Sequence, residues 1–206
     1  MKRGILKLRF LVGTAAILAP FLQQRPSDFA SRSFSASAAK QVDARMEQSL
    51  RAFAAVASVL TSPRCLNCHV PGDSPLQGDE ETPHNMNVKR GPGGKGTVAM
   101  RCSNCHQEVN SSALHAPPGA PGWRLPPPSM KMAWQGLSVG EICRTLKNPD
   151  KNGGRSLDQL EEHIRNDRIV NWAWNPGPGR SMPPLSHEEF VEEFTEWVQT
   201  GASCAP

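Results

Sequence analysis

The chain contains two related pentapeptides, Cys65-Leu66-Asn67-Cys68-His69 and Cys102-Ser103-Asn104-Cys105-His106. Both read Cys-x-x-Cys-His, the pattern that attaches c-type haem to a polypeptide. Cysteines at i and i+3 lie on one face of a helical turn, within reach of two vinyl groups on one porphyrin edge. The histidine that follows can bind the iron. The pattern predicts two haems c, with Cys65, Cys68, Cys102 and Cys105 as thioether residues and His69 and His106 as proximal iron ligands.

Two other sites can use pairs of cysteines. A four-cysteine zinc ribbon usually has about 15–20 residues between its pairs, whereas 33 residues separate Cys68 from Cys102. Zinc also gives no reason for a histidine directly after both pairs. A thioredoxin-like dithiol needs a βαβ pattern around it, and none is visible. The haem interpretation is therefore favoured over both.

The N-terminus has the features of an export signal. Lys2, Arg3, Lys7 and Arg9 form a basic segment, and an apolar run follows at residues 10–22. At 13 residues the run is shorter than the roughly 20 residues of a membrane-spanning helix. No Arg-Arg pair is present, which favours general secretion. We expect residues 1–38 to be a signal peptide and the mature chain to be periplasmic, without a stable membrane span; an uncleaved anchor is the alternative.

Cleavage at the predicted site would change the net charge of the chain. Ala36-Ser37-Ala38 fits the small-x-small rule for cleavage. Residues 1–38 hold six of the 23 Lys and Arg and one of the 19 acids, so residues 39–206 carry 17 bases and 18 acids. The basic pI of the full chain therefore gives no indication of nucleic-acid binding.

Residues 39–206 are expected to form one all-α, loop-rich domain, a small helical cytochrome c-like fold wrapped around two covalently bound haems. Apolar residues recur at three- and four-residue steps over residues 42–61 and predict a helix that Pro63 ends. Ser138, Ser156 and Ser186 each begin a capping box and predict three further helices. Residues 70–99, 116–129 and 175–184 are rich in Pro and Gly, and no segment alternates as a strand does. The loop between the motifs should bring the two haem pockets close together.

Two cysteines lie outside the motifs, Cys143 and Cys204. In an oxidising compartment an even remainder predicts a disulfide. The bond would join the helix after Ser138 to the end of the chain. Two unpaired thiols are the alternative.

The sixth position of each iron needs a further ligand. The remaining histidines are at 84, 115, 163 and 187, and the candidate methionines are at 86, 130, 132 and 182. His84 lies in the loop between the motifs and is expected to bind one iron. For the other iron, His163 and Met182 are the alternative candidates. His163 shares a helix with apolar residues, and Met182 precedes an amphipathic helix. His187 is expected to be solvated.

Beyond the motifs, the second half of the chain resembles exported bacterial proteins labelled isoquinoline 1-oxidoreductase subunit. The resemblance covers roughly residues 60–205 and is carried by Trp123-Arg124-Leu125, Met132-Ala133-Trp134-Gln135-Gly136, Glu141-Ile142-Cys143, Asn152-Gly153-Gly154-Arg155 and Trp172-Ala173-Trp174-Asn175-Pro176-Gly177. Isoquinoline oxidoreductase itself is a molybdenum hydroxylase with iron–sulfur clusters, and this chain has no ferredoxin-type cysteine run. The resemblance therefore implies an electron-acceptor partner of such an enzyme.

The sequence favours an electron carrier that exchanges single electrons with periplasmic redox proteins, a dehydrogenase subunit among them. Such a carrier needs no catalytic side chain, only a haem edge and a weak docking patch. A small dihaem enzyme of the peroxidase kind, or a haem-based ligand sensor, is the alternative. Either would need an iron with an open sixth position.

Overall fold

The computed structural model describes the backbone of residues 27–206 and the side chains of residues 36–206. The basic and apolar segments of the expected signal peptide lie outside these residues, so the leader and its cleavage remain predictions. The chain divides into two units between Ala39 and Lys40, and residues 40–206 form the second. The second unit contains both Cys-x-x-Cys-His motifs, and the description below concerns this unit.

The described residues are mainly helical, as the sequence predicted. The helices are α1 (Ser27–Leu60), α2 (Pro63–Leu66), α3 (Val139–Lys147), α4 (Pro149–Asn152), α5 (Leu157–Asn166), α6 (Arg168–Trp172) and α7 (His187–Gln199). Three 3₁₀ turns lie between them: η1 (Asn85–Asn87), η2 (Pro92–Gly94) and η3 (Cys102–Asn104). One feature was not predicted: β1 (Leu76–Gln77) pairs antiparallel with β2 (Thr82–Pro83). At two residues each, these strands are too short to show alternation.

The three predicted capping boxes are all formed. The hydroxyls of Ser138, Ser156 and Ser186 accept a hydrogen bond from the backbone N–H three residues on, and the Glu or Gln there bonds back. These reciprocal bonds satisfy backbone N–H groups that otherwise lack a partner at a helix start. They set the starts of α3, α5 and α7, the helices that cover the core.

The core lies where the C-terminal half of α1 meets α7. Phe53, Val56 and Ala57 are buried on α1, and the ring of Phe53 lies 4.7 Å from that of Trp197 on α7. Ile142 of α3 and Leu160 of α5 belong to the same buried cluster. This apolar face holds the helices together, and Cys65 and Leu66 of the first motif and the loop residue Trp134 also pack in or against it.

The apolar residues that predicted this helix extend farther toward the N-terminus than its buried face does. Val42 is 66 % exposed and Met46 is 48 % exposed, although both fit the helical period. Arg45 on the same turns donates to the carbonyl of Gln199, the last residue of α7. Burial on α1 thus begins near Ser49, which is level with the C-terminal end of α7.

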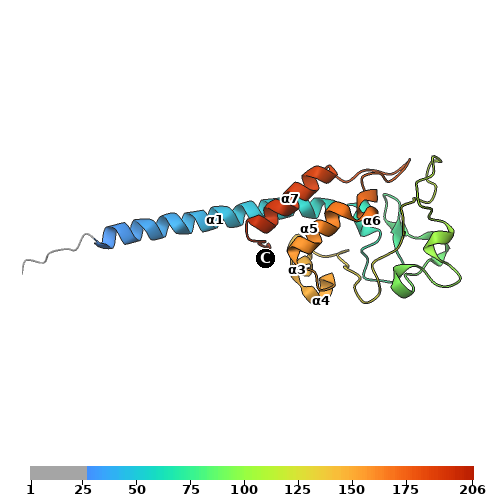
Figure 1. The fold of residues 1–206 in the computed structure, drawn as a ribbon, viewed down its shortest axis with the longest axis horizontal. Coiled ribbons are helices and arrows are strands. Elements are labelled where there is room, and N and C mark those ends of the chain that lie inside the picture. The colour runs from blue at the N-terminus through green and yellow to red at the C-terminus, as the bar shows by residue number, and fades with distance from the viewer. Residues whose placement is uncertain (1–26) are drawn as a thin grey trace, which may run out of the picture. The chain divides into compact units, whose positions relative to one another are not determined.

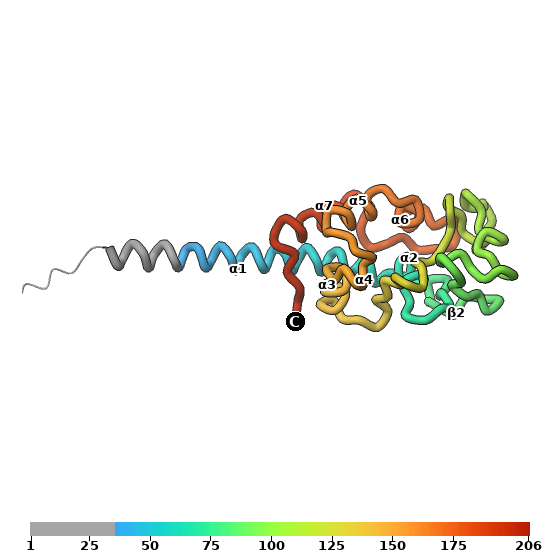
Figure 2. Tube along the Cα trace, turned by 60° about the horizontal axis from the view of Figure 1, so that its bottom comes forward, coloured from blue at the N-terminus to red at the C-terminus, as the bar shows by residue number. Residues whose placement is uncertain are grey.

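Figures 1 and 2 show how this helical layer positions the loops. In both views α3, α5 and α7 lie alongside the C-terminal half of α1, and the loops of residues 70–130 gather beyond the end of that helix. Gly94 in these loops has a φ of 75°, and a Cβ there would lie 1.9 Å from the carbonyl oxygen of Leu125. Only glycine permits this close approach, which joins the loop before the second motif to the segment after it.

The predicted disulfide between Cys143 and Cys204 is present, with 5.6 Å between the Cα atoms. It joins α3 to the C-terminal segment that follows α7. None of the helices within residues 27–206 has the length and apolar character needed to cross a bilayer.

The disulfide should contribute measurably to stability. Because it closes a loop with a sequence separation of 61 residues, replacing both cysteines by serine should lower the free energy of unfolding by about 4 kcal/mol. Urea denaturation of the wild type and the double variant measures the difference. A loss below about 1 kcal/mol would contradict the expectation.

Candidate functional site

Both motifs fold into the same short turn. In the first, the N–H groups of Cys68 and His69 donate to the carbonyl of Cys65, at 3.1 and 3.2 Å. In the second, the N–H groups of Cys105 and His106 donate to the carbonyl of Cys102, at 3.2 and 2.9 Å. The predicted helical turn is therefore formed twice, once at the end of α2 and once in η3.

Each motif histidine is oriented by a backbone carbonyl from another part of the chain. Nδ1 of His69 lies 2.9 Å from the carbonyl oxygen of Met132, and Nδ1 of His106 lies 2.7 Å from that of Pro118. A carbonyl can only accept, so Nδ1 carries the proton in each ring and Nε2 holds the free lone pair. A histidine that binds a metal through Nε2 commonly has this second hydrogen bond.

Each motif histidine also stacks on a tryptophan. The ring of His69 lies 3.8 Å from that of Trp134, with 12° between the planes. The ring of His106 lies 4.5 Å from that of Trp123, with 5° between the planes. Stacking and hydrogen bonding together fix the rotation of each imidazole. Nothing in the sequence indicated which tryptophans contact the histidines.

Burial keeps these groups uncharged. It lowers the pKa of His69 to about 4 and lowers the pKa of His106 as well. Neutral imidazole is the form that binds a metal. Burial also raises the pKa of the Cys65 thiol to about 12 and that of Cys68 to about 11. A redox dithiol works through a thiolate of lowered pKa, so these raised values oppose that alternative.

A cavity of about 530 Å³ opens beside the second motif. Its wall includes Cys102, Cys105 and His106, and Cys68 of the first motif lines the same cavity. The two motifs are therefore close together, as the length of the loop between them suggested. Pockets for small molecules and cofactors have volumes of about 300–1,000 Å³.

His84 lies across this cavity from His106. The two ring centres are 6.2 Å apart, and Nδ1 of His84 is 2.9 Å from the carbonyl oxygen of Asn85. Each metal–imidazole bond measures about 2 Å, and each nitrogen is about 1 Å from its ring centre, so two imidazoles on one metal need roughly 6 Å. The spacing of His84 and His106 matches this requirement, and Nδ1 has a carbonyl partner in both rings.

Two other candidate ligands, Met86 and His115, line the same cavity, and the remaining ones lie elsewhere. Met182 is 55 % exposed in the loop before α7 and does not line the cavity. His163 is half-buried on α5, near enough to His69 for its charge to affect the pKa of that residue. His115, which gave no signal in the sequence, lines the cavity with His84. His187 was expected to be solvated, but it is half-buried, and its Nε2 lies 2.8 Å from the carbonyl oxygen of Ile164.

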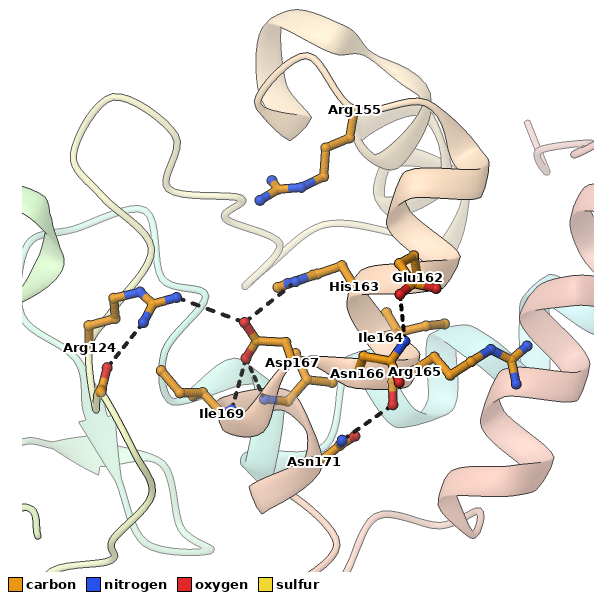
Figure 3. Close-up of polar contacts among 12 residues, drawn as sticks. Arg124, Arg155, Glu162, His163, Ile164, Arg165, Asn166, Asp167, Ile169 and Asn171 are labelled. Atoms are coloured by element: carbon orange, nitrogen blue, oxygen red, sulfur yellow. Dashed lines mark hydrogen bonds and ion pairs between the residues drawn. The ribbon is translucent and has the colours of Figure 1, made fainter. Parts of the chain in front are cut away.

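Asp167 connects the surroundings of the two motifs (Figure 3). It caps α6 by accepting from the backbone N–H groups of Ile169 and Val170. Its Oδ2 also lies 3.8 Å from Arg124 and 3.7 Å from Nδ1 of His163. Arg124 follows Trp123, the tryptophan beside His106, so one carboxylate joins that segment to the α5 residue nearest His69.

Arg90 holds the loop between the motifs in place. Its side chain is fully buried and donates to the carbonyls of Pro126, Val70 and Gly72, at 2.6, 3.1 and 3.1 Å. Val70 and Gly72 follow the first motif directly, and Pro126 belongs to the segment after the second. A single guanidinium thus bonds to three loop carbonyls, of which that of Val70 is buried, and brings the two segments together.

The four motif cysteines are unpaired, whereas Cys143 and Cys204 are bonded to each other. Residues 27–206 contain no cluster of three or more His, Cys, Asp or Glu arranged to hold a metal ion. Structural zinc requires four such ligands in tetrahedral geometry, so the zinc-ribbon alternative has no support in this part of the chain.

Comparison with protein-family models, with curated proteins and with solved structures finds no match to this chain. Function is therefore argued from the residues themselves.

The role of Arg90 can be tested by substitution. Arg90→Met removes the donor from three loop carbonyls, that of buried Val70 among them, and deletes a fully buried charged side chain from its ion pair with Asp73, so we expect the free energy of unfolding to fall by about 2–4 kcal/mol. Lys89→Met is the matched control, because exposed Lys89 bonds only to the Ser74 hydroxyl and should change stability by no more than about 0.5 kcal/mol. Equal effects of the two changes in urea denaturation would refute the assignment.

Proposed function

We propose that this chain is an exported dihaem c-type cytochrome that transfers single electrons between redox partners. The proposal rests on two Cys-x-x-Cys-His turns of the same geometry. Each has a histidine whose Nδ1 faces a carbonyl and whose ring stacks on a tryptophan. Two separate segments of the chain thus have the same arrangement. Two histidines with only a structural role would not need to share it, so the repetition supports a common function.

The residues present fit a haem at the second motif. Cys102 and Cys105 on the cavity wall would form the thioethers, His106 would bind the iron and His84 would bind its opposite face. The support for a haem at the first motif is the repeated turn, with Cys65, Cys68 and His69 in the corresponding positions. His163 is the remaining candidate for its sixth ligand, because Met182 is exposed in a loop.

The spacing of His84 and His106 is the observation that favours a carrier. Two imidazoles 6.2 Å apart would together hold one iron, and such an iron would have no open position for a substrate or gas. When bound, haem supplies a one-electron change between Fe(III) and Fe(II), at a potential set by its ligands and burial. The chain's part is to hold both rings in place and, through burial, to keep His106 neutral. A peroxidase-like enzyme or a ligand sensor would require an open position instead.

The proposed partners are periplasmic redox proteins. The resemblance to proteins labelled isoquinoline 1-oxidoreductase subunit supports a dehydrogenase subunit as electron donor, with this chain as its acceptor. Export by general secretion, with a leader over residues 1–38, is part of the same proposal, because haem c is attached outside the cytoplasm.

Haem content tests the proposal directly. Protein made in a strain competent for cytochrome maturation should carry two covalent haems by intact-mass spectrometry. The Cys65→Ala/Cys68→Ala variant should lose the mass of one porphyrin, and so should the Cys102→Ala/Cys105→Ala variant. The Cys143→Ser/Cys204→Ser variant is the control and should keep both. A colourless wild-type protein would refute the proposal.

The ligation of the second haem is tested by removing His84. The wild type should be low-spin and unresponsive to carbon monoxide, because both axial positions are filled. His84→Ala should convert one haem to a high-spin form that binds carbon monoxide, as seen in the visible spectrum. His115→Ala is the matched control from the same cavity wall and should leave the spectrum unchanged. If His115→Ala produced the high-spin haem instead, the assignment of His84 would be wrong.

A further inference from the structure

Arg64 has an unusual environment for a charged residue. Its side chain is only 1 % exposed, and its Nη2 donates to the carbonyl of Gly78 and pairs with Asp79. Its Nε is buried and has no hydrogen-bond partner; the Nε of Arg90 is unpaired as well, but Arg90 does not line the cavity. Arg64 directly precedes Cys65 in the sequence, yet it lines the cavity of the second motif. A buried donor without a partner costs free energy, so this Nε indicates a missing acceptor at the cavity.

A second arginine lies close by on the same wall. Arg180 is half-buried, and it donates to the carbonyls of Pro176 and Ala116. Burial lowers the pKa of Arg180, and the positive charge of Arg64 lowers it further. Two guanidinium groups this near repel each other unless an anion lies between them.

Asp79 supplies only part of the negative charge that the two arginines require. One of its oxygens pairs with Arg64, and the other accepts a hydrogen bond from the backbone N–H of Ser181 at 2.9 Å. Both oxygens are therefore engaged. Arg101 also lines the cavity, so three arginines there face two acids, Asp79 and Glu80.

Aromatic contacts connect Arg64 to the motif histidine. Its guanidinium carbon lies 6.0 Å from the ring centre of Trp172. Trp172 meets Trp123 edge to face at 4.8 Å, and Trp123 stacks on His106. This continuous packing places the positive charge beside the ring system of the second motif, while the same charge also acts on Cys65 and Cys68 of the first.

We propose that Arg64 and Arg180 bind the carboxylates of the cofactor in this cavity, which are the propionates of the second haem. The inference rests on the proposed function and deepens it. Guanidinium groups pair with carboxylates through parallel hydrogen bonds, and Nε of Arg64 is the donor that such a bond would use. Arg64 thereby belongs to the second haem site, although its position in the sequence next to Cys65 suggests the first.

The test measures the midpoint potentials of the two haems in the full-length, haem-loaded protein. Arg64→Gln and Arg180→Gln each remove a positive charge beside a propionate, which favours Fe(III), so the potential of one haem should fall. We expect a shift of roughly three- to tenfold in the redox equilibrium, where tenfold corresponds to about 59 mV for one electron. The pH range over which this potential varies should also move upward, because the carboxylate loses a cation that keeps its pKa low.

Three comparisons make the result decisive. Arg64→Lys keeps the charge and should restore most of the potential, and Arg165→Gln removes an exposed arginine on α5 and should change neither potential. In the Cys65→Ala/Cys68→Ala background, which should keep only the second haem, Arg64→Gln should still lower the potential. Because Arg64 is buried, Arg180→Gln gives an independent result if the Arg64 variants do not fold.

Failure of the inference can be distinguished from failure of the proposed function. If the wild type carries no haem by mass, the proposed function is wrong. If it carries two haems and both glutamine variants keep the potentials and pH profiles of Arg165→Gln, the arginines serve only to pair with Asp79 and the loop carbonyls, and the inference alone is overturned. A shift confined to the first haem would also overturn it.

Discussion

The hydrogen bond from each motif imidazole to a backbone carbonyl is the constraint on which the arrangement of the loops depends. His69 reaches Met132 across 63 residues of sequence, and His106 reaches Pro118 across 12. Each bond leaves Nε2 as the free nitrogen and brings a following tryptophan, Trp134 or Trp123, against the ring. The segment of residues 118–134 is therefore folded back onto both motifs, and one side of the cavity is built from it.

Arginines hold together a region that has little regular structure. The loops of residues 70–130 have many carbonyls with no partner in a helix or sheet, and such groups must be satisfied when they are buried. Arg90 bonds to three of them, and Arg180 to two. Each guanidinium has five donors in a fixed plane, so one side chain can join several loop segments. Arg64 and Arg90 each have a buried Nε without a hydrogen-bond partner, and of the two only Arg64 lines the cavity of the second motif.

Several features were predictable because they are local. The capping boxes at Ser138, Ser156 and Ser186 depend only on residues three positions apart, and all three formed. The disulfide followed from counting cysteines, since Cys143 and Cys204 were the only two outside the motifs. The apolar period over residues 42–61 predicted a helix there, but it did not show that Val42 and Met46 would be exposed. Helical periodicity shows which residues share a face, but not how far a neighbouring helix extends along that face.

The sequence by itself determined the two Cys-x-x-Cys-His turns, the helical class and the starts of the main helices, because each depends on residues within one or two turns. Only the tertiary structure decided that His84 faces His106, that two particular tryptophans stack on the motif histidines, and that Arg64 lies at the second site. These contacts join residues 17 to 108 positions apart, and no local pattern encodes them. They arise because buried carbonyls, rings and charges must each find a partner once the loops are packed together.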